Sequence, residues 1–137
     1  MNYTRIALAA LVSFAAYFVV GGLTFTIPSF RNEFLKYSAV YRPKQGQLSH
    51  MPAGMVAMFV AMLALAVLYA MLYRGGPRLF EGARFGALIA VFFVGTFVVH
   101  NYVNLNIGLK LTLQQAIAYS AEWILVGMII GLVYKPA

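Results

Sequence analysis

Residues 51–73 read MPAGMVAMFVAMLALAVLYAMLY, a run of 23 residues without a charged side chain. As an α-helix rising about 1.5 Å per residue, this run is long enough to cross the ~30 Å hydrocarbon core of a bilayer. In lipid, a single segment satisfies its backbone hydrogen bonds only as a helix. The run therefore predicts a transmembrane helix.

Three further apolar runs, at residues 6–26, 85–103 and 111–134, have similar character. Apolar residues make up 63% of the chain and charged residues 9%, against roughly 45–50% and about 25% in soluble domains. Arg5 precedes the first run, but no cleavage pattern follows it, so a retained helix is expected rather than a signal peptide. The sequence predicts an all-α membrane protein, a four-transmembrane-helix bundle in one domain over residues 1–137.

The connection at residues 27–50 carries aromatic side chains at helical spacing. These are Phe30, Phe34, Tyr37 and Tyr41. Ser29, after Pro28, is a suitable N-cap, and the pattern favours an amphipathic helix in the membrane interface. An irregular loop at headgroup level is the alternative. Residues 42–46 (RPKQG) would then turn the chain back towards the membrane.

The basic residues divide evenly between the two ends of such a bundle. Arg5, Arg74, Arg78, Arg84 and Lys135 fall on the side of both termini. Arg31, Lys36, Arg42, Lys44 and Lys110 fall on the other side. The positive-inside rule gives a tie of five against five, and the short basic turn at 74–78 favours cytoplasmic termini.

Small residues at helical spacing predict close helix packing, either within the chain or between copies. On the fourth run they are Ala116, Ser120, Gly127 and Gly131. The second run offers Ala57 and Ala61, and Gly82 and Gly86 lie at the start of the third.

Glu122, near the middle of the fourth run, is the most informative residue, because an ionisable group there is costly. Gln115 and Tyr119 extend it into a polar stripe that faces away from Gly127 and Gly131. By topology, residues from three runs would converge in the same half of the bundle. The expected cluster is Glu122, Tyr119, Gln115, His100, Asn101, Thr96 and His50.

Three interpretations of this cluster remain open. It is a structural hydrogen-bonded network with a neutral Glu122, a proton-coupled or ligand-binding site centred on Glu122, or a metal or haem site using His50 and His100. Two histidines are the bare minimum for axial haem ligation, so our main expectation is that the chain binds no cofactor.

The sequence lacks the residues that several other functions require. The chain has no cysteine and no aspartate, which excludes thiolate metal sites, disulfides and a Ser-His-Asp triad. No nucleotide-binding or zinc-protease motif is present, so we expect no enzyme. The net charge of +7 sits between apolar runs, where lipid headgroups explain it, so no nucleic-acid binding is expected.

Four segments resemble a loose group of small bacterial four-helix membrane proteins of uncharacterised function. They are EGARFG (81–86), HNYVNLNI (100–107), AEWILVG (121–127) and GLVYKP (131–136). The resemblance covers mainly residues 81–137, and it implies architecture rather than activity. A weaker analogy links the chain to small multidrug-resistance transporters, which have four helices, balanced charge and one membrane glutamate. Their glutamate lies in the first helix, so no residue maps across.

Together these features predict a non-enzymatic bacterial inner-membrane bundle that contacts lipid and either itself or other membrane subunits. It would work as a homo-oligomer or as an accessory subunit of a larger complex. The alternative is a small proton-coupled transporter that uses Glu122.

Overall fold

The structure is a computed structural model that describes residues 1–136, which fold into helices without any β-strand. The helices are α1 (Tyr3–Thr24), α2 (Pro28–Leu35), α3 (Lys44–Leu72), α4 (Arg78–Phe93), the π-helical turn η1 (Val94–Val99), α5 (His100–Asn104) and α6 (Leu109–Val133). Since α4, η1 and α5 continue as one helix, these residues include four helices long and apolar enough to cross a membrane. The predicted four-helix transmembrane bundle is confirmed.

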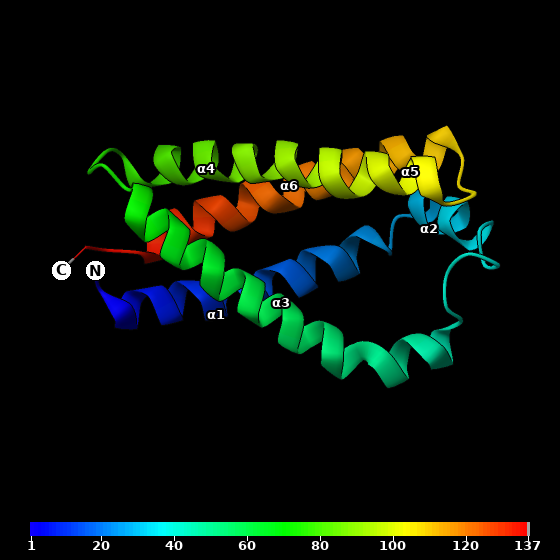
Figure 1. Cartoon of the computed structure of the whole chain (residues 1–137), viewed down its shortest axis with the longest axis horizontal. Coiled ribbons are helices and arrows are strands. Elements are labelled where there is room, and N and C mark those ends of the chain that lie inside the picture. Colours follow the sequence, from blue (N-terminus) through cyan, green and yellow to red (C-terminus); the bar gives the residue numbers. More distant parts are fainter. Residues whose placement is uncertain (137) are drawn as a thin grey trace.

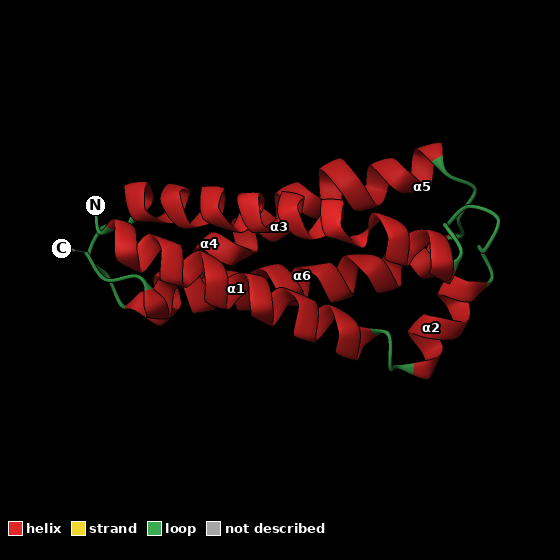
Figure 2. Ribbon diagram, turned by 90° about the horizontal axis from the view of Figure 1, so that it is seen from below, coloured by secondary structure: helices red, strands yellow, loops and turns green. Residues whose placement is uncertain are grey.

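The four long helices run up and down, with both termini and the α3–α4 turn at one end (Figure 1). α2 and the connection between α5 and α6 lie at the other end (Figure 1). α4 packs along α6, and α1 lies between α6 and α3. Towards its Lys44 end, α3 diverges from the other helices, as Figure 1 shows, whereas Tyr69 of α3 packs on Phe85 of α4 with ring centroids 5.4 Å apart. The bundle is therefore tight at the end with the termini and open at the other (Figures 1 and 2).

The closest helix contact joins α4 and α6 through four glycines. A Cβ atom on Gly86 would lie 2.5 Å from the carbonyl oxygen of Trp123, and one on Gly127 would lie 2.6 Å from the backbone nitrogen of Gly86. Gly82 and Gly131 are equally crowded, with 2.9 Å between a Cβ on Gly131 and the Cα of Gly82. The predicted packing glycines thus meet within one chain, where their missing side chains let the two backbones touch.

Ala116 and Ser120, predicted on the same packing face, are half-buried further towards the start of α6. Beside the glycine contact, the buried core combines apolar side chains of all four spans. It includes Ile6, Ala9 and Ala10 of α1, Met62, Ala66 and Tyr69 of α3, Phe85 and Ala90 of α4, and Trp123, Val126 and Ile130 of α6.

The connection after α1 contains a helix, as predicted, but a shorter one. α2 begins at Pro28, whose fixed φ suits the first helical position, and Ile27 is the N-cap without a side-chain bond. The prediction of Ser29 as the cap is wrong, because that residue already lies inside the helix. The backbone N–H groups of Lys36 and Tyr37 bond three residues back, which tightens the chain into turns and leaves Tyr37 and Tyr41 beyond the helix.

α3 begins seven residues before the apolar run that predicted it, at Lys44 rather than Met51. Pro43 precedes it in an extended conformation, and its carbonyl accepts the N–H of Gln47 to start the helix. The polar first turns stay exposed. Residues 44–46, expected in a turn, are therefore helical, and the turn lies just before them.

We predict that Gly127→Ala destabilises the protein by about 1–3 kcal/mol, because its methyl group would overlap the backbone of Gly82 and Gly86. Thermal unfolding in detergent, followed by the fluorescence of the single tryptophan, Trp123, measures the effect. Gly22→Ala is the control, since a Cβ there meets nothing within 4 Å. If both variants melted like the wild type, the glycine contact between α4 and α6 would be refuted.

Candidate functional site

Glu122 lies in the middle of α6 with its side chain 3% exposed. The carboxyl group faces α1 at Gly21, where an added Cβ would lie 2.9 Å from Oε1. Oε1 has no hydrogen-bond partner among residues 1–136, although buried polar atoms are normally paired. Gly21 therefore makes room for a buried acid that α6 and α1 leave unsatisfied.

A cavity of about 30 Å3 adjoins this carboxyl group. Its walls come from the end of α1, from α2 and from α6, at Gly21, Thr24, Phe25, Phe30, Ala118, Tyr119 and Glu122. That volume is enough for a water molecule, and the carboxyl oxygen supplies a polar partner for one.

The predicted polar stripe of Gln115, Tyr119 and Glu122 does lie along one side of α6. Gln115 is 5% exposed, and its Nε2 donates to the hydroxyl oxygen of Tyr41 at 3.3 Å. Tyr119 is half-buried, with its ring 5.0 Å from that of Phe93. Gln115 and Glu122 thus face the segment after α2 and the end of α1, whereas Tyr119 packs on α4, the helix that Gly127 and Gly131 also contact.

The expected convergence of the other polar residues on Glu122 is wrong. Thr96 is exposed and donates to the carbonyl of Phe92 at 2.7 Å, within its own helix. His100 is exposed and Asn101 is half-buried. His50 is exposed at the start of α3, where Arg42 lies 3.3 Å from its Nε2.

The physical reasons are the π turn η1 and the early start of α3. A π turn holds more residues than an α turn, so it rotates the following residues around the helix axis. Val98 is fully buried, whereas Thr96 and His100 point outward. Because α3 begins at Lys44, His50 belongs to its exposed polar end. No hydrogen bond joins the two histidines in the described part of the chain.

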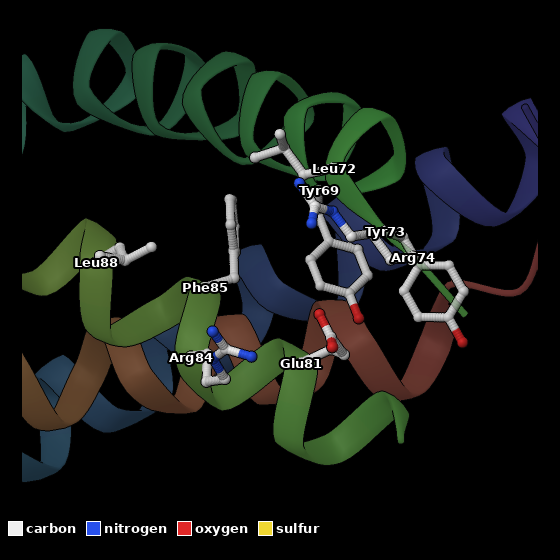
Figure 3. A pocket seen from close by; sticks show the side chains of 8 residues that line it. All are labelled: Tyr69, Leu72, Tyr73, Arg74, Glu81, Arg84, Phe85 and Leu88. Carbon is white, nitrogen blue, oxygen red and sulfur yellow. The ribbon is translucent and has the colours of Figure 1, made fainter. Parts of the chain in front are cut away.

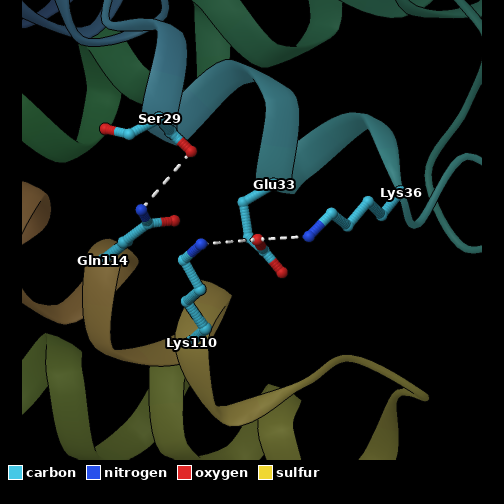
Figure 4. A network of polar contacts seen from close by, with 5 residues as sticks. All are labelled: Ser29, Glu33, Lys36, Lys110 and Gln114. Carbon is cyan, nitrogen blue, oxygen red and sulfur yellow. Dashed lines mark hydrogen bonds and ion pairs between the residues drawn. The ribbon is translucent and has the colours of Figure 1, made fainter.

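Glu33 is a polar residue of the structure that the sequence analysis missed. Its carboxylate, 5% exposed as a residue, lies 2.8 Å from Nζ of Lys36 and 3.2 Å from Nζ of Lys110 (Figure 4). Nearby, Nε2 of Gln114 donates to the carbonyl of Ser29 at 3.4 Å (Figure 4). The Glu33–Lys110 ion pair and the Gln114–Ser29 hydrogen bond attach α2 to the first turns of α6. The only sequence signal was the Glu33–Lys36 spacing of three residues on a helix.

The lysines also set the charge state of this attachment. The hydrogen bond from Lys36, then that from Lys110, lowers the pKa of the Glu33 carboxyl below its usual value, and Glu33 in turn raises the pKa of Lys36. The pair is therefore ionised at neutral pH.

A second cavity, of about 300 Å3, lies at the end that holds the termini (Figure 3). Its polar lining residues are Tyr69, Tyr73, Arg74, Glu81 and Arg84. Tyr69 is 2% exposed and its hydroxyl has no hydrogen-bond partner in the described residues. No sequence motif indicates this site, because its residues come from either side of the α3–α4 turn.

These features define a four-span helical membrane protein with one carboxyl group buried in mid-span. The sequence model of a family described as protein of unknown function (DUF1761) matches residues 8–131, so the chain belongs to this family. The match includes Gly21, Glu33 and Glu122, and it agrees with the predicted resemblance to uncharacterised small membrane proteins. No curated protein and no solved structure matches the chain.

We predict that acid releases α2 from α6. A folded-state pKa below the usual 4.5 means that the Glu33 contact stabilises docking above about pH 4.5 and is lost as the pH falls through the lowered value. Hydrogen exchange of residues 28–41, corrected for the intrinsic rate, should rise in that range. Glu33→Gln should remove this pH dependence, whereas Glu81→Gln, at the other end of the bundle, should keep it. Identical pH profiles for wild type and Glu33→Gln would show that the carboxylate does not hold α2.

Proposed function

We propose that the chain is a non-enzymatic protein of the bacterial inner membrane that works in a homo-oligomer or as an accessory subunit of a larger membrane complex. In this proposal both termini face the cytoplasm, no cofactor is needed, and the partners are lipid and further membrane helices. Nucleic acid is not among them. The proposal is carried by one face of α3.

α3 is the most apolar of the four spans and has the smallest share of its span buried. It turns Met62, Ala66 and Tyr69 towards the bundle. On another side, small residues recur at intervals of three and four, which places them on one helix face. We call these four exposed residues, Gly54, Ala57, Ala61 and Ala64, the small-residue face.

Lipid gives helices no hydrophobic reason to associate, so close approach at small residues is the usual means. The glycines of α4 and α6 show this principle within the chain. By contrast, a Cβ on Gly54 would meet nothing within 4 Å. The small-residue face supports the proposal because, like the internal contact, it consists of small residues, and no helix within residues 1–136 covers it.

We predict that native mass spectrometry of protein released gently from its membrane finds a multiple of the 15.1 kDa chain or a complex with foreign subunits. Ala57→Leu with Ala61→Leu should shift the protein towards the single-chain mass, because larger side chains keep helices apart. Ala121→Leu, an exposed alanine of α6, is the matched control and should keep the assembly. A wild-type protein found only as a single chain would overturn the proposal.

A small proton-coupled transporter is the second candidate, favoured by the burial of Glu122. Placing an ionisable residue within a membrane span costs free energy, so such a residue is a candidate for a functional role. Here Oε1 has no hydrogen-bond partner in residues 1–136 and borders a cavity with the volume of one water molecule. A carboxyl group in that position is able to exchange a proton when an opening between α1 and α6 lets water reach it.

For this candidate, Glu122→Gln is the decisive variant, because it keeps the shape and hydrogen-bonding capacity while removing the exchangeable proton. In proteoliposomes with an imposed pH gradient, we predict that this variant lowers proton flux to background. The control is Gln114→Ala, a half-buried residue eight positions earlier on α6, which should leave the flux intact. Undiminished flux in Glu122→Gln would exclude Glu122 as the coupling residue.

A further inference from the structure

The open end of the bundle contains a cavity of about 720 Å3. It lies between the end of α1, the α2 segment and the start of α3, where α3 diverges from the other helices (Figure 1). We call this space the wedge. Its charged and aromatic lining residues are Arg31, Arg42, Lys44, Phe25, Phe34 and Tyr41.

The charge of the wedge is wholly positive. Arg31, Arg42 and Lys44 line it and no carboxylate does. Glu33, the acidic residue of the adjacent helix, is already engaged by Lys36 and Lys110. The cavity at the other end differs, because Glu81 lines it together with Arg74 and Arg84.

The three cations have few ties to the rest of the protein. Arg42 lies 3.3 Å from the ring nitrogen Nε2 of His50, and none of the three cations forms an ion pair with a carboxylate in residues 1–136. Guanidinium groups match the oxygens of a phosphate with two parallel hydrogen bonds, and an ammonium group adds a point charge. The wedge therefore suits an anion with several oxygens.

Three aromatic rings form part of the remaining wall. Phe34 stacks on Tyr41 with ring centroids 4.3 Å apart, and Phe25 meets Phe34 edge to face at 5.2 Å. Towards the membrane, Met51 and Met55 of α3 are exposed. A ligand that fills both parts needs an anionic head and an apolar body.

We infer that the wedge binds the phosphate-bearing headgroup of an anionic phospholipid, with the acyl chains lying between the diverging ends of α1 and α3. The basic residues occupy the headgroup level because they flank the ends of two spans. The aromatic wall contacts the glycerol region, and the hydrocarbon chains follow the exposed apolar surface of α3. This inference is independent of whether the chain is an assembly subunit or a transporter.

The test compares lipid retention by native mass spectrometry after reconstitution in nanodiscs of phosphatidylglycerol and phosphatidylcholine in equal amounts. We expect the wild type to keep phosphatidylglycerol at collision energies that remove phosphatidylcholine. Replacing Arg31, Arg42 and Lys44 by Gln should reduce that retention by about tenfold or more. Replacing Arg5, Arg74 and Lys135 by Gln is the control with the same change of charge at the other end, and it should retain the lipid.

The folding of each variant is checked by the thermal unfolding signal of Trp123, and Arg31→Lys with Arg42→Lys keeps the charge should the neutral variant unfold. That conservative variant should retain phosphatidylglycerol above phosphatidylcholine. Equal retention of the two lipids, or equal losses in both triple variants, would overturn the inference. Full displacement of the lipid by millimolar inorganic phosphate would also overturn it, since the site would then serve a free anion.

Discussion

The contact between α4 and α6 is the constraint on which the rest of the structure depends. In lipid no hydrophobic force drives helices together, so the stability of the bundle must come from dispersion contacts made at short range. Gly82 and Gly86 facing Gly127 and Gly131 allow two backbones to touch. This pair fixes which side of α6 remains for α1, and it therefore directs Glu122 towards Gly21 instead of towards α4.

The buried acid follows from that geometry. With one side of α6 taken by α4, Gln115 and Glu122 face the segment after α2 and the end of α1, while Tyr119 packs its ring on Phe93 of α4. Gln115 reaches Tyr41 in this segment, and Lys110 reaches Glu33. Glu122 lies deeper in the span, and its Oε1 has no hydrogen-bond partner among the described residues. The missing partner of the Glu122 carboxyl group is thus a consequence of its depth in the membrane span. Gly21, which has no side chain, leaves the space that this carboxyl group occupies.

The sequence predicted those features that depend on local composition: the four spans, a helix in the first connection, the packing glycines of α6 and the polar stripe beside Glu122. It failed where tertiary contacts decide. The π turn at Val94–Val99 has no compositional signal, yet it turns Thr96 and His100 outward. α2 ends at Leu35 within a segment held by Lys36 and Lys110, so Tyr37 and Tyr41 leave the helical pattern that their spacing indicated.

α3 connects the assembly proposal with the lipid proposal. Tyr69 and Phe85 hold one end of α3 against the bundle, whereas no residue in its first 18 positions is buried. A helix fixed at one end has its other end positioned by whatever contacts it. The wedge borders that free end at Lys44 and Gln47, and the small-residue face begins two turns further along at Gly54. A phospholipid in the wedge and a partner helix on the small-residue face would both contact the free end of α3. Binding of one would therefore change the position of α3 that the other meets.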